Sequence, residues 1–245
     1  MVVTLKHPLA VTPTRRVWID KPGRDEKRPL GIPTIRERAR QALVKLALEP
    51  EWEAKFEPNS YGFRPGRSAH DAIEAIFLAI KQKPKYVLDA DIAQCFECIN
   101  QAVLLEKATT APWLRRILRG WLKAGVMEGK EWFATPDGTP QGGVISPLLA
   151  NIALHGMETH LQHQFPPRHI RINGKQRKIP SPSLIRYADD FIVLHEDLQV
   201  VQAAAESLAQ WLQGIGLALN PQKTRLAHTL DELDGKSGFE FLGFW

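Results

Sequence analysis

The sequence has few cysteines and no long apolar run. Its 245 residues include only two cysteines, Cys95 and Cys98, in a Cys-x-x-Cys spacing. With no second pair and no nearby histidine, four zinc ligands cannot be assembled locally, so we expect reduced thiols. No apolar stretch approaches the length needed to span a bilayer, and residues 1–8 lack the hydrophobic region of a secretory signal. We therefore expect a cytoplasmic protein, in a bacterium or inside an organelle, that is not secreted and has no membrane partner.

Positive charge is in modest excess and is unevenly distributed. The net charge is +5, but residues 15–40 contain nine Lys or Arg against four acids, and residues 168–178 contain five and no acid. Phosphate backbones bind such clusters with release of counterions, so nucleic acid is the expected partner, and a solvated surface is the alternative. The second cluster surrounds Asn173 and Gly174, a strong turn pair, which predicts a basic β-hairpin.

Periodicity predicts a mixed α+β protein. Apolar residues recur at helical spacing over 36–56, 69–80 and 199–214, and a Ser-Pro pair begins another expected helix at residue 146. Strands are expected near 85–92, 184–194, 217–226 and 239–244. The composition, 44% hydrophobic and without a flexible linker, suits one domain or two closely packed subdomains.

Residues 187–190, with the sequence YADD, form the most informative segment, in the middle of the apolar run 184–194. The β-branched and aromatic residues on both sides are typical of strands, and the small and acidic residues between them are typical of a hairpin turn. Asp189 and Asp190 are therefore predicted at a hairpin tip. Adjacent like charges raise the energy of the ionised state, which a divalent cation relieves. A solvated turn, in which Asp is common, is the alternative.

A second acidic strand is predicted just before residue 93. Because successive strand side chains point to opposite faces, Asp89 and Asp91 share one face, and Leu88 and Ile92 take the other. Asp91 lies nearer the strand end and is the predicted ligand. Two strands can bring carboxylates to a pair of Mg²⁺ ions about 4 Å apart, the arrangement used for in-line phosphoryl transfer.

Seven blocks of sequence, in this order, resemble the motifs of reverse transcriptases encoded by group II introns. They are RPLGIP (28–33), SYGFRPGRS (60–68), DIAQCF (91–96), TPQGGVISPLLAN (139–151), YADD (187–190), GLALNPQKT (216–224) and FEFLGF (239–244). The resemblance implies a right-hand polymerase of the α+β class, with an antiparallel palm sheet backed by helices. It implies partial N-terminal fingers over 1–84 and a palm with fingers-like insertions over 85–245, without the thumb and maturase regions of full-length members.

The resemblance assigns catalysis to Asp91, Asp189 and Asp190. With the backbone carbonyl of Ile92, they would bind two Mg²⁺ ions, for which Mn²⁺ is a substitute, and activate the 3′-hydroxyl of a DNA primer on an RNA template. The substrates would be dNTPs. Intron RNA, in a ribonucleoprotein, is the further partner that the resemblance implies.

Residues near the incoming nucleotide follow from the same resemblance. The family positions are matched by Lys21, Arg28, Phe96, Gln141, Gly142 and Lys223. The first two would bind the triphosphate, Phe96 would exclude a ribose 2′-hydroxyl, and Lys223 would protonate the departing pyrophosphate. The other two belong to the loop under the templating pair, where glycine lets the backbone approach closely. Surface charges, a core aromatic side chain and an ordinary turn are the structural alternatives for these positions.

Four basic residues are candidates for nucleic-acid contact. Arg64 and Arg67 match positions that either contact the template or shape the fingers, and the sequence does not separate these roles. Arg171 and Lys175 belong to the basic hairpin. The segment 241–244 matches the primer-grip strand of the family, where aromatic side chains more often pack than contact DNA.

Three functions agree with these residues. The first is an RNA-directed DNA polymerase. The second is a catalytically weak or inactive maturase-type fragment that binds intron RNA and assists splicing, which the basic clusters favour. The third, a palm-type nucleotide cyclase or nuclease, would also use paired carboxylates but would need neither a ring at Phe96 nor the PQGG block.

Overall fold

The structure is a computed structural model that describes residues 11–20, 27–172, 175–233 and 237–245. The chain forms two compact units, each made of two separate segments. Unit 1 consists of Met1–Lys55 and Gln94–Ala153, and unit 2 of Phe56–Ala93 and Leu154–Trp245. The sequence predicted one boundary, between residues 84 and 85, that separates fingers from palm. The two units of the structure are instead interleaved in the sequence. Which residues serve as fingers and which as palm stays a prediction.

Unit 1 contains a four-stranded sheet and a set of helices. The strands are β1 (Thr14–Asp20), β2 (Lys27–Ile32), β4 (Val126–Glu128) and β5 (Glu131–Phe133), in the order β2-β1-β4-β5. The helices are α1 (Ile35–Glu53), α3 (Cys95–Cys98), α4 (Gln101–Lys107), α5 (Pro112–Leu122) and α6 (Ser146–Leu154), whose last residue belongs to unit 2. Inside the unit, Glu37 accepts hydrogen bonds from Arg40 Nη1 at 2.9 Å and from Trp121 Nε1 at 2.6 Å, and so joins α1 to α5.

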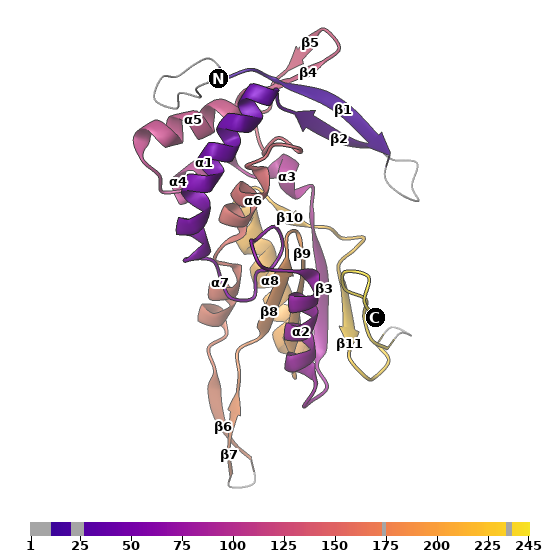
Figure 1. The fold of residues 1–245 in the computed structure, drawn as a ribbon. Helices are drawn as coiled ribbons and strands as arrows, with labels where there is room; N and C mark the ends of the chain where they lie inside the picture. The colour runs from indigo at the N-terminus through magenta and orange to yellow at the C-terminus, as the bar shows by residue number, and fades with distance from the viewer. Residues whose placement is uncertain (1–10, 21–26, 173–174, 234–236) are drawn as a thin grey trace. The chain divides into compact units, whose positions relative to one another are not determined.

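Unit 2 is built on an antiparallel sheet. Its strands are β3 (Tyr86–Ala93), β8 (Ser183–Tyr187), β9 (Asp190–His195), β10 (Ala218–Leu219) and β11 (Arg225–His228). The order is β10-β3-β9-β8, and β11 also pairs with β3. Helix α2 (Ala69–Ile80) packs against β8, helix α8 (Leu198–Gln213) against β3 and β9, and α7 (Met157–Gln164) against α8 and β8. Figure 1 shows α2 and α8 on opposite faces of this sheet.

Both faces of the central strands are buried, which explains the continuous apolar sequence of β9. Its residues 191–194 are at most 1% exposed. On the α2 face, Val87, Ile185 and Ile192 form a core cluster with Ala72 and Ile76 of the helix. Asp91 lies on this same face because it is four residues, two full pleats, from Val87. The strand that fills the core therefore also presents a carboxylate near its end.

The basic sequence around residue 173 forms the predicted hairpin. Strand β6 (Arg168–Ile172) pairs with β7 (Lys175–Ile179) in an antiparallel register that places Ile172 opposite Lys175. Residues 173 and 174 lie outside the described residues. The hairpin forms its own two-stranded sheet.

The segment 239–244 is not the strand that the sequence predicted. Phe241 N donates to Phe244 O at 2.8 Å, and Phe244 N donates to Phe241 O at 3.0 Å. Between them, Leu242 has a φ of 54° and Gly243 a φ of 80°, so the chain makes a tight turn of the kind that has positive φ at both central residues. Glycine at the second position permits this turn.

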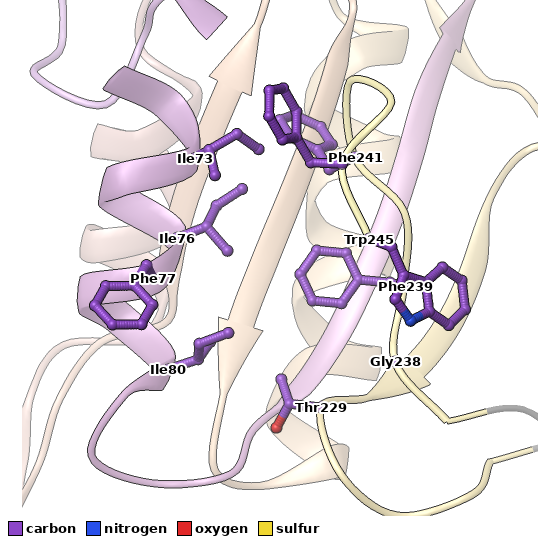
Figure 2. Close-up of a pocket in the computed structure, with 10 residues that line it drawn as sticks. Ile73, Ile76, Phe77, Ile80, Thr229, Gly238, Phe239, Phe241 and Trp245 are labelled. Carbon is purple, nitrogen blue, oxygen red and sulfur yellow. The ribbon is translucent and has the colours of Figure 1, made fainter. Parts of the chain in front are cut away.

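This turn and α2 enclose an apolar pocket of about 360 Å³ in unit 2. Figure 2 shows Ile73 and Ile76 of α2 on one side and Phe239, Phe241 and Trp245 on the other.

No helix among the described residues is long and apolar enough to cross a membrane.

Candidate active site

The YADD segment forms the tip of the β8–β9 hairpin, as predicted. Tyr187 pairs with Asp190, so Ala188 and Asp189 alone make the turn. Ala188 has a φ of 58°. Two-residue hairpin turns need such positive values, but a residue with a Cβ adopts them at a cost of roughly 1–2 kcal/mol. Strain is thus present at the residue that directly precedes the acidic pair.

Strand β3 brings Asp91 to this turn. Asp91 is directly opposite Asp190 in the antiparallel register, and Ile92 N donates to Asp189 O at 3.1 Å. The prediction that Asp91 meets the hairpin tip is therefore confirmed. The catalytic and metal-binding roles of these residues stay predictions.

Asp89 shares the face of Asp91 but has a different partner. Arg225 Nε donates to Asp89 Oδ2 at 2.8 Å from the neighbouring strand β11. Burial raises the pKa of Asp89, and the guanidinium opposes that shift. Asp89 thus forms a cross-strand ion pair, which supports the choice of Asp91 as the site carboxylate.

Asn220 and Lys223, which follow β10 in the sequence, both contact Asp91. Lys223 Nζ donates to Asp91 Oδ2 at 2.5 Å, and Asn220 Nδ2 donates to Asp91 Oδ1 at 3.4 Å. The backbone N–H of Asn220 also donates to Asp91 O at 2.8 Å. The resemblance identified Lys223, whereas Asn220 was missed. Its position in the same NPQK block was the available signal.

Negative charge accumulates at this end of the sheet. Burial, together with the charges of Asp189 and Asp91, raises the pKa of Asp190 to about 7, and the Lys223 ammonium opposes the shift. The site therefore disfavours a full set of ionised carboxylates at neutral pH unless more positive charge is supplied.

A divalent cation fits this site by donor chemistry and by charge. Carboxylate oxygens are ligands that Mg²⁺ and Mn²⁺ prefer, and a cation would offset the charges of Asp189 and Asp91 that, with burial, raise the pKa of Asp190. Within the ranges that the structure describes, no three His, Cys, Asp or Glu side chains are gathered as a preformed metal cluster. Lys223 occupies one acceptor site of Asp91 Oδ2, so a cation that binds this carboxylate would share it with the ammonium.

Predicted nucleotide-binding residues come together in unit 1. Thr139 N donates to Phe96 O at 2.6 Å, and Gly31 N donates to Gln141 O at 2.6 Å. Gly142 has a φ of 108° and lies close to the carbonyl of Gly31. Three of the blocks, RPLGIP, DIAQCF and TPQGG, therefore meet at one loop, with Phe96 half-buried beside it.

Two residues that support this loop were missed. Gln41 Oε1 accepts a hydrogen bond from Val144 N at 2.8 Å, and Ser146 Oγ donates to Pro140 O at 2.8 Å. The signal for Ser146 was its place in the TPQGGVISPLLAN block, whereas nothing in the sequence around Gln41 indicated contact with residues a hundred positions away. Arg28 is exposed on β2, and Lys21 lies outside the described residues.

The four basic candidates differ in exposure. Arg64 is buried, and its Nη1 donates to Glu57 O at 2.9 Å and Ser60 O at 2.6 Å. Of its two predicted roles, these contacts support shaping of the fingers over contact with the template. Arg67 is exposed and lies over the Tyr61 ring. Arg171 is exposed on β6, and the side chain of Lys175 lies outside the described residues.

Comparison with known sequences gives one family. The family model described as reverse transcriptase (RNA-dependent DNA polymerase) matches residues 19–245. Protein YkfC of Escherichia coli strain K12 is 32% identical over 263 residues, which cover 94% of this chain and 66% of that protein. The group II intron-encoded protein LtrA of Lactococcus lactis is 38% identical over 149 residues, 60% of this chain and 25% of LtrA. The chain thus spans at most 66% of the length of these two relatives.

Solved structures show the same fold at low sequence identity. A truncated apo telomerase from Candida tropicalis superposes with a TM-score of 0.70 at 14% identity, covering 94% of this chain and 52% of that one. Telomerase from Candida albicans, in complex with a fragment of telomeric RNA, gives 0.69 at 16% identity, covering 98% of this chain and 44% of that one. The fold is therefore that of a right-hand polymerase, in agreement with the predicted α+β class. With Asp91 beside the YADD turn and a family match over nearly its whole length, the chain belongs to the reverse transcriptase family.

Proposed function

We propose that this protein is an RNA-directed DNA polymerase of the group II intron type, which adds dNTPs to a primer 3′-hydroxyl on an RNA template. The observation that supports it most is the cross-strand pairing of Asp91 with Asp190, next to Asp189 in the turn. Membership of the reverse transcriptase family favours this function over a nucleotide cyclase or nuclease.

The carboxylates of Asp91, Asp189 and Asp190 would hold two Mg²⁺ ions, with the carbonyl of Ile92 as a further ligand. Bound there, the ions would lower the pKa of the primer hydroxyl and neutralise charge on the reacting phosphate. The chain itself contributes the Lys223 ammonium, which lies at Asp91 and would protonate the departing pyrophosphate.

The unit 1 loop would receive the nucleotide and the templating base. Phe96 would exclude the ribose 2′-hydroxyl, Gln141 and Gly142 would lie under the base pair, and Arg28 with Lys21 would bind the triphosphate. The backbone hydrogen bonds between these blocks support a common role, because they fix the loop against the Phe96 segment and β2. Exposed Arg67 and the hairpin residues Arg171 and Lys175 would contact nucleic acid.

A primer-extension assay tests the polymerase. The protein, an RNA template with an annealed DNA primer, dNTPs and Mg²⁺ should yield extended primer. Asp190→Asn should lower the rate at least about a hundredfold, because one oxygen donor and its charge are lost from the site. Asp231→Asn is the matched control, since that side chain is 83% exposed on the same unit. Equal activity of Asp190→Asn and the native protein would refute the assignment.

A maturase-type role is the second candidate, and the basic β6–β7 hairpin favours it. A protein of Euglena gracilis named as maturase-like is 32% identical over 131 residues, which cover 52% of this chain and 28% of that protein. In this case intron RNA would bind with equal affinity to the native protein and to Asp190→Asn, and extension would be absent from both.

A further inference from the structure

A fully buried arginine precedes the YADD turn. Arg186 lies on β8 and is 0% exposed. It is opposite Phe191 in the register, so its side chain takes the sheet face away from Asp190. Burial of a guanidinium costs several kcal/mol unless the group is hydrogen-bonded and its charge is compensated, so this residue requires specific partners.

Its side chain joins the turn to a distant segment. Arg186 Nη1 donates to Ala188 O at 2.9 Å, and Nη2 donates to Ser60 Oγ at 2.7 Å. The carbonyl that it binds is that of the residue with the positive φ. One guanidinium thus fixes the strained residue of the turn and ties it to the SYGFRPGRS block.

The backbone of that block is attached to the same strand. Arg186 N donates to Asn59 O at 2.9 Å, and Tyr61 N donates to Arg186 O at 2.8 Å. Next to them, a Cβ at Gly62 would lie 2.3 Å from Ala188 N, so this glycine lets the segment pack directly under the turn. The segment 59–62 therefore lies alongside β8, in a parallel bridge of Ser60 with Arg186, and supports the turn from that edge.

A buried carboxylate compensates the charge. Glu158 of α7 is buried and accepts a hydrogen bond from Asn59 Nδ2 at 2.7 Å. Burial raises the pKa of Glu158, and the positive charge of Arg186 opposes this shift. Arg186, Asn59 and Glu158 thus form a polar network inside unit 2, beneath the acidic pair.

We propose that Arg186 is a positioning residue for polymerisation. By binding the Ala188 carbonyl and Ser60 at once, it holds Ala188 in its strained conformation and so fixes Asp189 and Asp190 relative to Asp91. This proposal rests on the proposed polymerase function. Arg186 contacts neither substrate nor cation in this role, and it acts through the turn.

Two conservative variants test it. Arg186→Lys keeps the charge but lacks the planar fork that reaches two acceptors. Ser60→Ala removes only the Nη2 acceptor. Each should lower kcat for dNTP addition, by about tenfold for Arg186→Lys and less for Ser60→Ala, with KM for primer–template unchanged, because misplacement of reacting groups mainly affects the chemical step. Arg116→Lys, an exposed α5 residue, is the matched control.

Hydrogen exchange gives a second measurement that does not depend on activity. Peptides that span residues 187–191 should exchange faster in both variants, whereas peptides from α8 should not change. Native kcat and native exchange at the turn in Ser60→Ala would overturn the positioning role, even if Arg186→Lys did not fold, while the polymerase function would stand. Native protein without extension activity would overturn the proposed function and this inference with it.

Discussion

The pKa of Asp190 reflects the burial and the charges of its surroundings. It is half-buried, lies opposite one carboxylate and follows another, and its pKa is raised to about 7 as a result. Lys223 opposes that shift from its position at Asp91 Oδ2. The lysine therefore supplies positive charge to the carboxylates of the free protein.

Removal of this lysine should make the protein depend more on divalent cations. Lys223→Met should lower the melting temperature in EDTA, because the carboxylates lose a local countercharge. Mg²⁺ should then raise the melting temperature more in the variant than in the native protein, since a cation that binds the folded state stabilises it. Thermal unfolding with and without Mg²⁺ measures both effects.

Lys81→Met is the control for this experiment, because Lys81 is exposed at the end of α2. Its response to Mg²⁺ should equal that of the native protein. An identical Mg²⁺ response in Lys223→Met and Lys81→Met would contradict the role of Lys223 as a countercharge to the site.

The sequence predicted the positions of the acidic residues well and the burial of the arginines poorly. The period of two along β3 and the small residues of YADD placed Asp91 near a strand end and Asp190 at a hairpin tip, because strand geometry is local, whereas the meeting of the two was expected from the family resemblance. Arg64 and Arg186 have their roles through burial, and burial of an arginine depends on acceptors that the fold supplies: backbone carbonyls of a nearby loop for Arg64, and the distant Ser60 hydroxyl for Arg186. Sequence alone gives no measure of that environment.

At the scale of elements, the C-terminal turn shows where periodicity fails. Residues 239–244 are rich in aromatic side chains, which alternate with Glu240 at the start as in a strand, yet the structure has a tight turn at Leu242 and Gly243. A strand needs a partner along its length, whereas this segment pairs only Phe241 with Phe244. Helices α1, α2 and α8 were predicted closely because each buries one face at helical spacing.

The turn should contribute to stability through one aromatic side chain. Phe241 is 4% exposed in the core cluster with α2 and the sheet, whereas Phe244 is 39% exposed. Phe241→Ala should lower the free energy of unfolding by about 3–5 kcal/mol, because it leaves a cavity in a packed core. Phe244→Ala, the matched variant, should lower it by about 1 kcal/mol.

Urea denaturation of both variants measures these losses of unfolding free energy. The slope of the unfolding free energy against urea concentration should equal that of the native protein. Equal losses in the two variants would contradict the greater burial of Phe241.

At the scale of the whole molecule, the order of the blocks was predictable and the interleaving of the units was not. The chain passes between units after Lys55, after Ala93 and after Ala153. The last of these points lies within α6, and the second directly follows β3. No change in composition accompanies them, because contacts with distant segments, rather than local sequence, decide which unit a residue joins. A single boundary at residue 84 was the simplest division that the sequence offered.

The distribution of charge predicts where the whole protein binds nucleic acid. The net charge of +5 is small, but the β6–β7 hairpin contains exposed arginines without a nearby acid in its own sequence. Arg171→Gln should weaken RNA binding to a similar extent for different sequences, and it should reduce the slope of log affinity against log salt by about one, as expected for the loss of a phosphate contact. Arg177→Gln should have a smaller effect, because Arg177 already forms an ion pair with Glu196. Fluorescence anisotropy with a labelled RNA over a series of salt concentrations measures both slopes, and an unchanged slope in Arg171→Gln would contradict a phosphate contact of Arg171.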